Sequence, residues 1–216
     1  MVPKSGPLDY IRDPAEIYRQ SFATVEREAD LSALTPEMAK VATRLIHSCG
    51  MVDVLEDLAF SKDAALAGIK ALKSGAAVYC DVEMVKSGII ERNLPSPSRL
   101  VCTLNDRRAG HHGKESNNTR SAAGVDFWED LDGSICVIGN APTALFRLLE
   151  RMDEGAPKPA LIIGIPVGFI GAVESKVELA ANPRGAEFIT VHGRRGGSAM
   201  ASSVVNALAF LAAGKS

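Results

Sequence analysis

Hydrophobic and polar positions follow two different patterns along this chain of 216 residues. From about Ser61 onward, short and almost continuously hydrophobic runs are separated by longer stretches in which apolar residues recur at helical spacing. The runs are AAVYC (76–80), LVCTL (100–104), SICVIG (134–139), ALIIGI (160–165) and AEFITV (186–191). Strands that are hydrophobic on both faces are typical of a parallel sheet covered by helices on each side. The pattern therefore predicts a doubly wound α/β (α/β/α) fold with a mainly parallel, five-stranded sheet.

Helical patterns lie before, between and after these runs. They cover 61–75, 119–131, 141–152, 172–181 and 198–213, and Gly75 is expected to cap the first of them. The remaining stretches that resemble linkers are NLPSPS (93–98) and a polar loop at 105–118. Because neither stretch divides the chain into two parts with separate cores, we expect one domain over residues 1–216.

An N-terminal helical segment precedes the sheet. One helix is expected over 13–30, with Asp13 as its N-cap and Pro14 in its first turn. A second helix begins at Thr35, and its apolar residues recur at the spacing of a single buried stripe. At 100° per residue, His47 falls almost opposite that stripe, on the same face as Arg44. Such a histidine is either a solvated surface residue or an acid-base group, and periodicity alone leaves both readings open.

Composition narrows the class of protein. There are 24 basic and 26 acidic side chains, which give a net charge of −2, and no run of Lys and Arg forms a surface for nucleic acid or anionic lipid. The longest apolar run, 160–171, is too short to cross a bilayer and contains Pro166, and the N-terminus has no signal-peptide pattern. The four cysteines are scattered without a CxxC pair, so we expect buried thiols rather than disulfides or metal ligands. A cytoplasmic protein that binds no membrane is therefore expected.

Candidate binding residues follow the predicted strands, because ligands of parallel sheets bind at the carboxyl ends of the strands. These stretches are rich in glycine and contain several basic side chains: Arg107, Arg108, Lys114, Arg120, Lys176, Arg194 and Arg195. They are either ordinary polar loops or a site for a ligand with several anionic groups, and the clustered glycines favour the second reading. Neither GxxxxGK[ST] nor GxGxxG occurs in the chain, which argues against a nucleotide.

Metal and nucleophile motifs are also missing from the sequence. His111 and His112 are adjacent without an HExxH pattern, and no GxSxG motif is present, so we predict no metal site. Asp81 and Glu83 are interpreted as residues at a helix start. His47 is then the best candidate for acid-base chemistry, followed by His192.

The chain resembles a known family in five stretches of sequence. YIRDPAEIYRQSF, RLIHSCGMVD, GNAPTAL, PVGFIGAVESK and GRRGGSAMASSVVNALA together resemble precorrin-8X methylmutase, also called precorrin isomerase, of cobalamin biosynthesis. The resemblance covers essentially the whole chain. It implies a homodimer without a cofactor, with the substrate pocket near the subunit interface. The implied reaction moves a methyl group between two neighbouring ring carbons, C11 and C12, of precorrin-8X and gives hydrogenobyrinate.

The same resemblance assigns roles to particular residues. It makes His47 the acid-base group and places Ser21 and Arg44 in contact with the substrate. The acetate and propionate groups of the tetrapyrrole fit the basic strand ends. We therefore expect Arg120, Lys176 and Arg194 to bind carboxylates, and Asn118 to contribute a polar contact.

Three alternatives remain at this point. The chain is also consistent with a carrier that holds the tetrapyrrole without changing it, or with an isomerase that acts on the cobalt-containing macrocycle, whose metal would leave no ligand motif. RSAA and GRRGGSAM favour the metal-free substrate. A flavodoxin-like oxidoreductase has the right fold class but would need the phosphate loop that this sequence lacks.

Overall fold

A computed structural model describes residues 8–214, and their centre is a six-stranded sheet in the order β1-β6-β5-β4-β2-β3. The strands are β1 (Leu58–Phe60), β2 (Ala77–Cys80), β3 (Arg99–Cys102), β4 (Ile135–Ile138), β5 (Leu161–Gly164) and β6 (Glu187–Val191). All five predicted runs form strands, and these strands pair in parallel. The α/β fold class is thus confirmed.

The predicted number of strands was one too low. β1 pairs antiparallel with β6 at the edge of the sheet, with Leu58 opposite Val191. It has three residues and directly follows a 3₁₀ turn, η1 (Val52–Asp57). A strand this short does not produce a recognisable hydrophobic run, and its pairing depends on a partner about 130 residues away.

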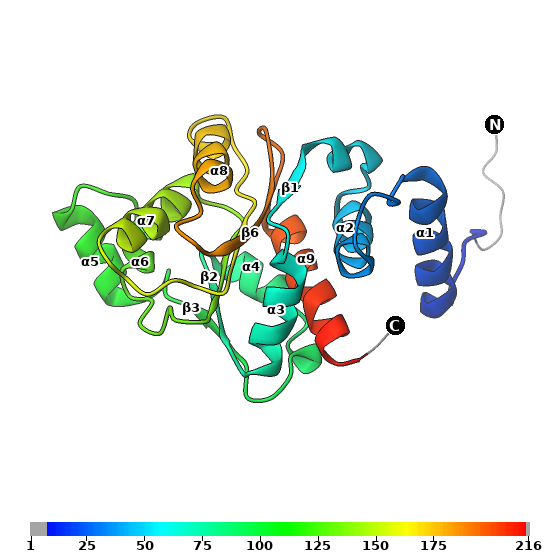
Figure 1. The fold of residues 1–216 in the computed structure, drawn as a ribbon, viewed down its shortest axis with the longest axis horizontal. Coiled ribbons are helices and arrows are strands. Elements are labelled where there is room, and N and C mark those ends of the chain that lie inside the picture. The colour runs from blue at the N-terminus through cyan, green and yellow to red at the C-terminus, as the bar shows by residue number, and fades with distance from the viewer. Residues whose placement is uncertain (1–7, 215–216) are drawn as a thin grey trace.

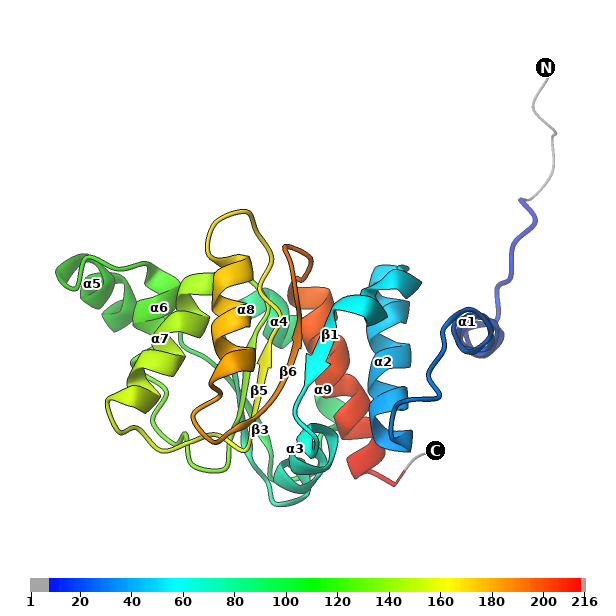
Figure 2. The ribbon, with the colours of Figure 1, turned by 45° about the horizontal axis from the view of Figure 1, so that its top comes forward.

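Helices cover both faces of the sheet (Figures 1 and 2). Their bounds are α1 (Pro14–Glu28), α2 (Pro36–Cys49), α3 (Ala64–Lys73), α4 (Glu83–Gly88), α5 (Arg107–Glu115), α6 (Arg120–Val125), α7 (Pro142–Asp153), α8 (Ala172–Ala181) and α9 (Ser198–Ala212). α1 and α2 lie at one end of the molecule, and α5 lies at the opposite end in both views.

Alternate residues along each strand enter two different hydrophobic cores. Val78, Val137 and Ile163 pack in the core that contains α2, α3, α4 and α9. Tyr79 and Ile162, on the opposite face, pack with α7 and α8. This alternation explains why the strand runs are hydrophobic throughout.

The cysteines are free thiols within these cores or at their margins, as expected. Cys80 and Cys136 are buried, whereas Cys49 and Cys102 are partly buried. Burial raises the pKa of the Cys136 thiol to about 12 and that of Cys102 to about 11. Neither is therefore a ready nucleophile.

Residues 105–118 were expected to form a polar loop, and this expectation was wrong, because α5 occupies most of the segment. Asp106 caps the helix by accepting a hydrogen bond from the Arg108 amide at 2.9 Å. Gly113 lies close to the start of α6, because a Cβ there would lie 3.2 Å from the carbonyl oxygen of Asn118 and 3.4 Å from the Cβ of Ala123. α6 itself ends at Val125, earlier than the predicted helix over 119–131.

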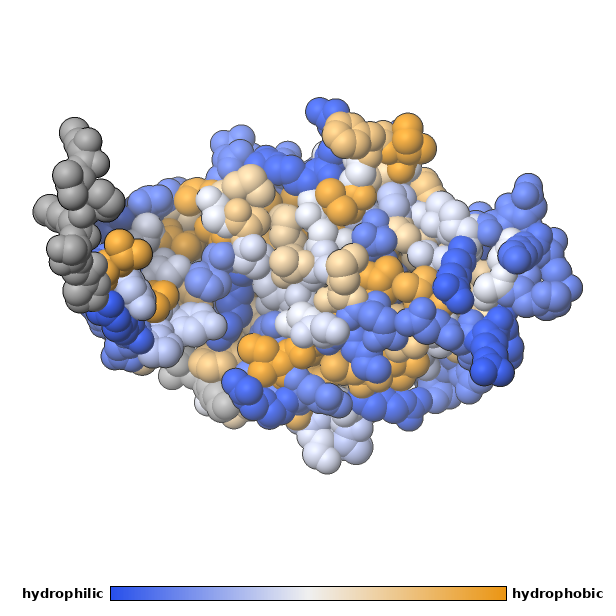
Figure 3. Space-filling model, turned by 180° about the vertical axis from the view of Figure 1, so that it is seen from behind, coloured by the Kyte–Doolittle hydropathy of each residue, from blue (hydrophilic) through white to orange (hydrophobic). Residues whose placement is uncertain are grey.

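Exposed apolar side chains of the described residues include two groups at separate places. Hydrophobic residues project at the top edge of the molecule in Figure 3, the edge where the loop between β5 and α8 lies in Figure 1. Phe169 and Ile170 of this loop are 82% and 89% exposed. The second place is α1 and the residues just before it, where Tyr10, Ile17 and Tyr18 are exposed and Val25 is the buried helix residue. Within residues 8–214, no helix has the length and apolar character needed to cross a membrane.

Candidate active site

α2 presents His47 at the surface as the sequence predicted. Thr35 caps the start of the helix by accepting from the Met38 amide at 3.3 Å, and Gly50 ends it with a φ of 69°. Met38 and Leu45 are buried, whereas His47 on the opposite face is exposed. His47 lies in the last helical turn of α2.

The side chain of His47 is held by α1. Its Nδ1 lies 2.7 Å from the Ser21 hydroxyl oxygen. The imidazole also packs against two rings of α1, with centroid distances of 5.6 Å to Tyr18 and 5.2 Å to Phe22. No described residue forms a hydrogen bond with Nε2. The arrangement therefore fixes one ring nitrogen and leaves the other available to a substrate.

Two cavities open beside the imidazole. The first, of about 290 Å³, lies between α1 and the end of α2 and is lined by Ser21, His47 and Val52, among others. The second, of about 440 Å³, lies between α2 and α9, and both Arg44 and His47 contribute to its walls. Because His47 belongs to both, a ligand in either cavity can contact its ring.

Arg44 is half-buried one turn before His47 and has no carboxylate partner among residues 8–214. Its guanidinium carbon lies 5.5 Å from the ring centroid of Phe22 and 4.9 Å from that of Phe210. Partial burial lowers the pKa of Arg44 from its ordinary value, and the group remains a cation. An unpaired cation in the wall of a cavity is suited to binding a carboxylate.

A third cavity, of about 400 Å³, is lined by the loops that follow α2, β5 and β6 and by the start of α9. Its walls include Met51, Phe169, Arg194 and Met200, and Met51 and Met200 directly follow residues that line the other two cavities. The lining is mostly apolar. The exposed Arg194 guanidinium stacks 5.1 Å from the ring centroid of Phe169 and has no carboxylate partner within the described part of the chain.

The loop that carries Arg194 is fixed on several sides. Arg195 forms ion pairs with Asp53 at 2.7 Å and with Asp57 at 2.6 Å, both in η1. Lys176 is fully buried, and its ammonium donates to the Arg195 carbonyl at 2.7 Å. Burial lowers the pKa of Lys176 to about 8. Lys176 was expected to bind a substrate carboxylate, but the structure places it beneath the loop rather than in the wall of these cavities.

Asn118 and Arg120 lie far from His47. With Lys114 and His111 they line a separate cavity of about 520 Å³ at the α5–α6 end of the molecule. α1 and α2, which carry Ser21 and His47, are at the other end (Figure 1). One chain therefore does not bring all the predicted substrate contacts together.

The carboxyl ends of β2 and β4 hold a buried carboxylate. Asp81 is 3% exposed and accepts hydrogen bonds from the amides of Gly139, Asn140 and Ala141 at 2.8 to 3.0 Å. The earlier interpretation of Asp81 as the start of its own helix was therefore wrong, because it binds the turn that leads into α7. Glu83, in contrast, does begin α4.

Sequence reasoning missed three polar residues of α9 at the second cavity, Ser202, Ser203 and Asn206. Asn206 donates to the Gly88 carbonyl at 2.9 Å and accepts from the Ile90 amide at 2.8 Å. An asparagine within the apolar stretch SSVVNALA was the available signal. His192, the second histidine candidate, lines none of the three cavities near His47. Residues 8–214 contain no cluster of three or more His, Cys, Asp or Glu side chains placed to hold a metal ion.

Comparison with known proteins gives a consistent result. The sequence profile of a family described as precorrin-8X methylmutase matches residues 16–211. The precorrin-8X methylmutase of Pseudomonas aeruginosa is 56% identical, over 94% of this chain and 98% of the relative. The cobalt-precorrin-8 methylmutase of Priestia megaterium is 36% identical, over 92% and 88%. The crystal structure of precorrin-8X methylmutase from Thermus thermophilus superimposes with a TM-score of 0.83 at 33% identity and covers 93% of this chain and 97% of that one.

Proposed function

Because the chain belongs to the precorrin-8X methylmutase family, whose members are isomerases of cobalamin biosynthesis, we propose that it converts precorrin-8X to hydrogenobyrinate. The observation that carries this proposal is the geometry of His47, whose Nδ1 is held by Ser21 and whose side chain lines two open cavities. The metal-free substrate is favoured because relatives named for it are 56% and 50% identical, whereas relatives named for the cobalt form are 36% identical or less.

In this proposal His47 is the proton donor. As an imidazolium, it donates from Nε2 to a ring nitrogen beside the migrating methyl group, which makes the neighbouring conjugated carbon electron-poor. The methyl group then moves within the same molecule, and His47 takes a proton back when the product forms. Ser21 accepts a hydrogen bond from Nδ1–H in both protonation states, so the imidazole keeps its orientation throughout.

Arg44 and Arg194 bind substrate carboxylates. Both are cations without a carboxylate partner in the described chain, and each lines a cavity: Arg44 the one that also contains His47, and Arg194 the one with mostly apolar walls. The apolar walls of the third cavity, including Met51 and Met200, suit the flat face of a tetrapyrrole. Holding the macrocycle by its rim and its face orients the migrating carbon against His47.

The active site is completed by a second subunit. Asn118 and Arg120 bind carboxylates of the substrate held in the other subunit's site, because they line a cationic cavity at the opposite end of the molecule from His47. The exposed apolar residues around α1, among them Ile17 and Tyr18, support a homodimer. In a two-fold arrangement, the α1–α2 end of each protomer packs against the α5–α6 end of its partner.

The central experiment compares wild type with His47→Ala. Purified enzyme is mixed with precorrin-8X, and the absorbance of the product is followed. His47→Ala is expected to lose turnover while still binding hydrogenobyrinate. Unchanged turnover in the variant would remove His47 from the mechanism, whereas tight binding without turnover by wild type would indicate a carrier. A parallel reaction with cobalt-precorrin-8 distinguishes the two substrates.

Mixed dimers test the shared site. His47→Ala and Arg120→Ala subunits are each expected to form weakly active homodimers. After the two are unfolded and refolded together, half of the dimers are mixed, and each mixed dimer contains one site with both residues intact. About a quarter of wild-type activity should therefore return. If no activity returns although mixed dimers are isolated, Arg120 does not act across the interface.

A further inference from the structure

Arg44 is a cation held by aromatic rings instead of by an acid. Its guanidinium lies between Phe22 of α1 and Phe210 near the end of α9, at 5.5 Å and 4.9 Å from the ring centroids. These three residues line a small enclosed cavity of about 110 Å³, together with Glu26 and Lys40. No carboxylate of residues 8–214, Glu26 included, lies within ion-pair distance of the guanidinium.

We infer that Phe22 and Phe210 are positioning residues that hold the Arg44 guanidinium in place for a substrate carboxylate. The inference deepens the proposed function, because it rests on Arg44 as a substrate contact. A carboxylate partner within the protein would orient Arg44 equally well, but it would also compete with the substrate for the same donors. Aromatic rings attract the cation through their faces and leave its N–H donors free.

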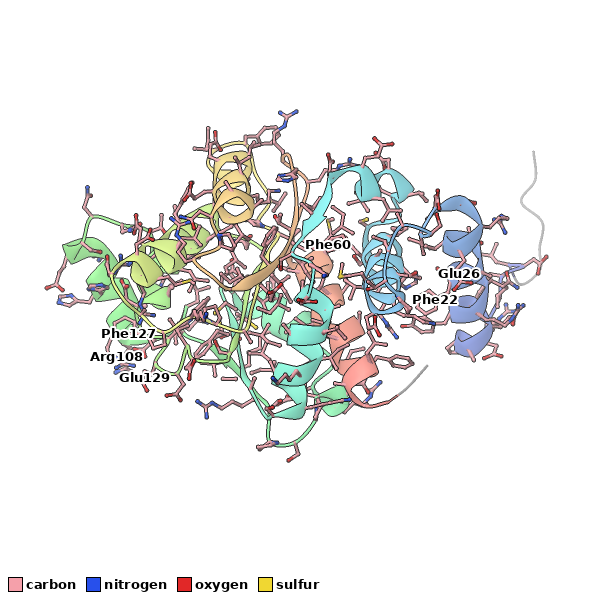
Figure 4. The ribbon with its side chains drawn as sticks, viewed as in Figure 1. Phe22, Glu26, Phe60, Arg108, Phe127 and Glu129 are labelled. Carbon is pink, nitrogen blue, oxygen red and sulfur yellow. The ribbon has the colours of Figure 1, made fainter. Side chains whose placement is uncertain are left out.

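Three elements distant in sequence form this arrangement. Arg44 belongs to α2, and its other contacts come from α1 and α9. Figure 4 shows Phe22 and Glu26 on the side of α1 that faces α2. Phe22 also contacts the His47 ring edge-on at 5.2 Å, so the docking of α1 orients both groups. Phe210 contacts the Arg44 guanidinium from α9, so it tests the positioning of Arg44 from a different element than the one that holds His47.

The chain contains a matched control at its other end. Arg108 stacks on Phe127 with a centroid distance of 4.6 Å, and both are labelled in Figure 4. Unlike Arg44, Arg108 has an ion-pair partner, Asp106, at 2.6 Å. Substitution of Phe127 therefore removes a comparable ring from an arginine that does not depend on it.

The kinetic experiment uses Phe210→Leu, Phe22→Leu and Phe127→Leu, each checked by circular dichroism for a wild-type melting curve. Phe210→Leu is expected to raise KM for precorrin-8X about three- to tenfold with kcat nearly unchanged, because ground-state and transition-state binding are lost equally. Phe22→Leu should raise KM and also lower kcat through His47. Phe127→Leu should change neither value.

A double-mutant cycle separates positioning from general packing. In an Arg44→Ala background, Phe210→Leu is expected to have no further effect on KM, because the ring then has nothing to orient. The same increase in KM in both backgrounds would overturn the inference, as would an unchanged KM in the single variant.

A structural readout tests the inference independently of the substrate. In enzyme labelled with ¹⁵N-arginine, the Nε–Hε signal of Arg44, assigned with Arg44→Lys, should be displaced by ring currents. It should move toward the random-coil position in Phe210→Leu and stay unchanged in Phe127→Leu. If the signal does not move, the rings do not hold Arg44. If it moves but Arg44→Ala leaves KM unaltered, the positioning stands and the role of Arg44 in the proposed function fails.

Discussion

The buried ammonium of Lys176 gives a quantitative prediction. Lys176 is fully buried beneath the loop that carries Arg194, and burial lowers its pKa from 10.5 to about 8. Between these two values, the unfolded chain binds the lysine proton and the native protein does not. The free energy of unfolding therefore rises with pH in this interval. Integration from pH 7 to pH 10 gives a gain of about 2 to 3 kcal/mol from this group.

The measurement is urea unfolding of wild type and Lys176→Met at several pH values. Methionine keeps the length and apolar stem of the side chain, and the lost hydrogen bond to the Arg195 carbonyl changes stability by an amount that does not depend strongly on pH. The difference between the two proteins should shift in favour of wild type by about 2 to 3 kcal/mol as the pH rises from 7 to 10.

Wild type must be compared with the variant because other groups lower the free energy of unfolding as the pH rises. Cys102 and Cys136 keep their protons in the native state well above the pH at which an unfolded cysteine loses its proton, so they reduce stability as the pH rises. Their contribution is common to both proteins and cancels. A wild-type-minus-variant difference that stays flat from pH 7 to 10 would refute the account of Lys176 as a desolvated cation.

Three further predictions concern single contacts. Ser21→Ala should lower kcat about tenfold with little change in KM, because a hydrogen bond to the imidazolium of about 1.5 kcal/mol is lost. Steady-state kinetics measures both constants, and a change confined to KM would make Ser21 a substrate contact. Gly196→Ala should reduce stability by about 2 kcal/mol or more in thermal melts, because its Cβ would lie 2.5 Å from the carbonyl oxygens of Ile165 and Pro166. Gly133→Ala is the control, since a Cβ there meets no atom within 4 Å, and a loss at Gly196 no larger than at Gly133 would contradict the prediction. Asp81→Asn should cost about 2 to 4 kcal/mol in urea unfolding, because one carboxamide oxygen replaces two carboxylate oxygens that accept three amides; a stability equal to wild type would exclude this role.

The sequence predicted those elements whose signal is local. The five parallel strands are hydrophobic on both faces, and helical periodicity placed His47 opposite the buried stripe of α2. β1 and α5 were missed for opposite reasons. β1 is too short to show a pattern, whereas α5 lies in a polar stretch without a recurring apolar stripe, which was interpreted as a loop.

The contacts of the candidate site were less predictable because they join distant segments. The periodicity of α2 placed Arg44 and His47 on one face, but the rings and the hydroxyl that hold them come from α1 and α9. Arg120 and Arg194 were grouped because each follows a predicted strand. The two strands, β3 and β6, are however separated by three others in the sheet. The buried position of Lys176 depends on how the β6–α9 loop folds over α8, which no local pattern encodes.

Asp81 supports the proposed position of the site beside α2 rather than at the carboxyl ends of the central strands. In doubly wound sheets, ligands with phosphate groups bind where neighbouring strands send the chain in opposite directions. Here that point is between β2, which leads to β3, and β4, which leads to β5. The backbone amides that would meet an anion there already donate to the Asp81 carboxylate. Because the protein fills this position with its own carboxylate, we expect the proposed polycarboxylate substrate to bind elsewhere, at the cavities lined by Arg44 and Arg194, which are cations free of carboxylate partners within residues 8–214.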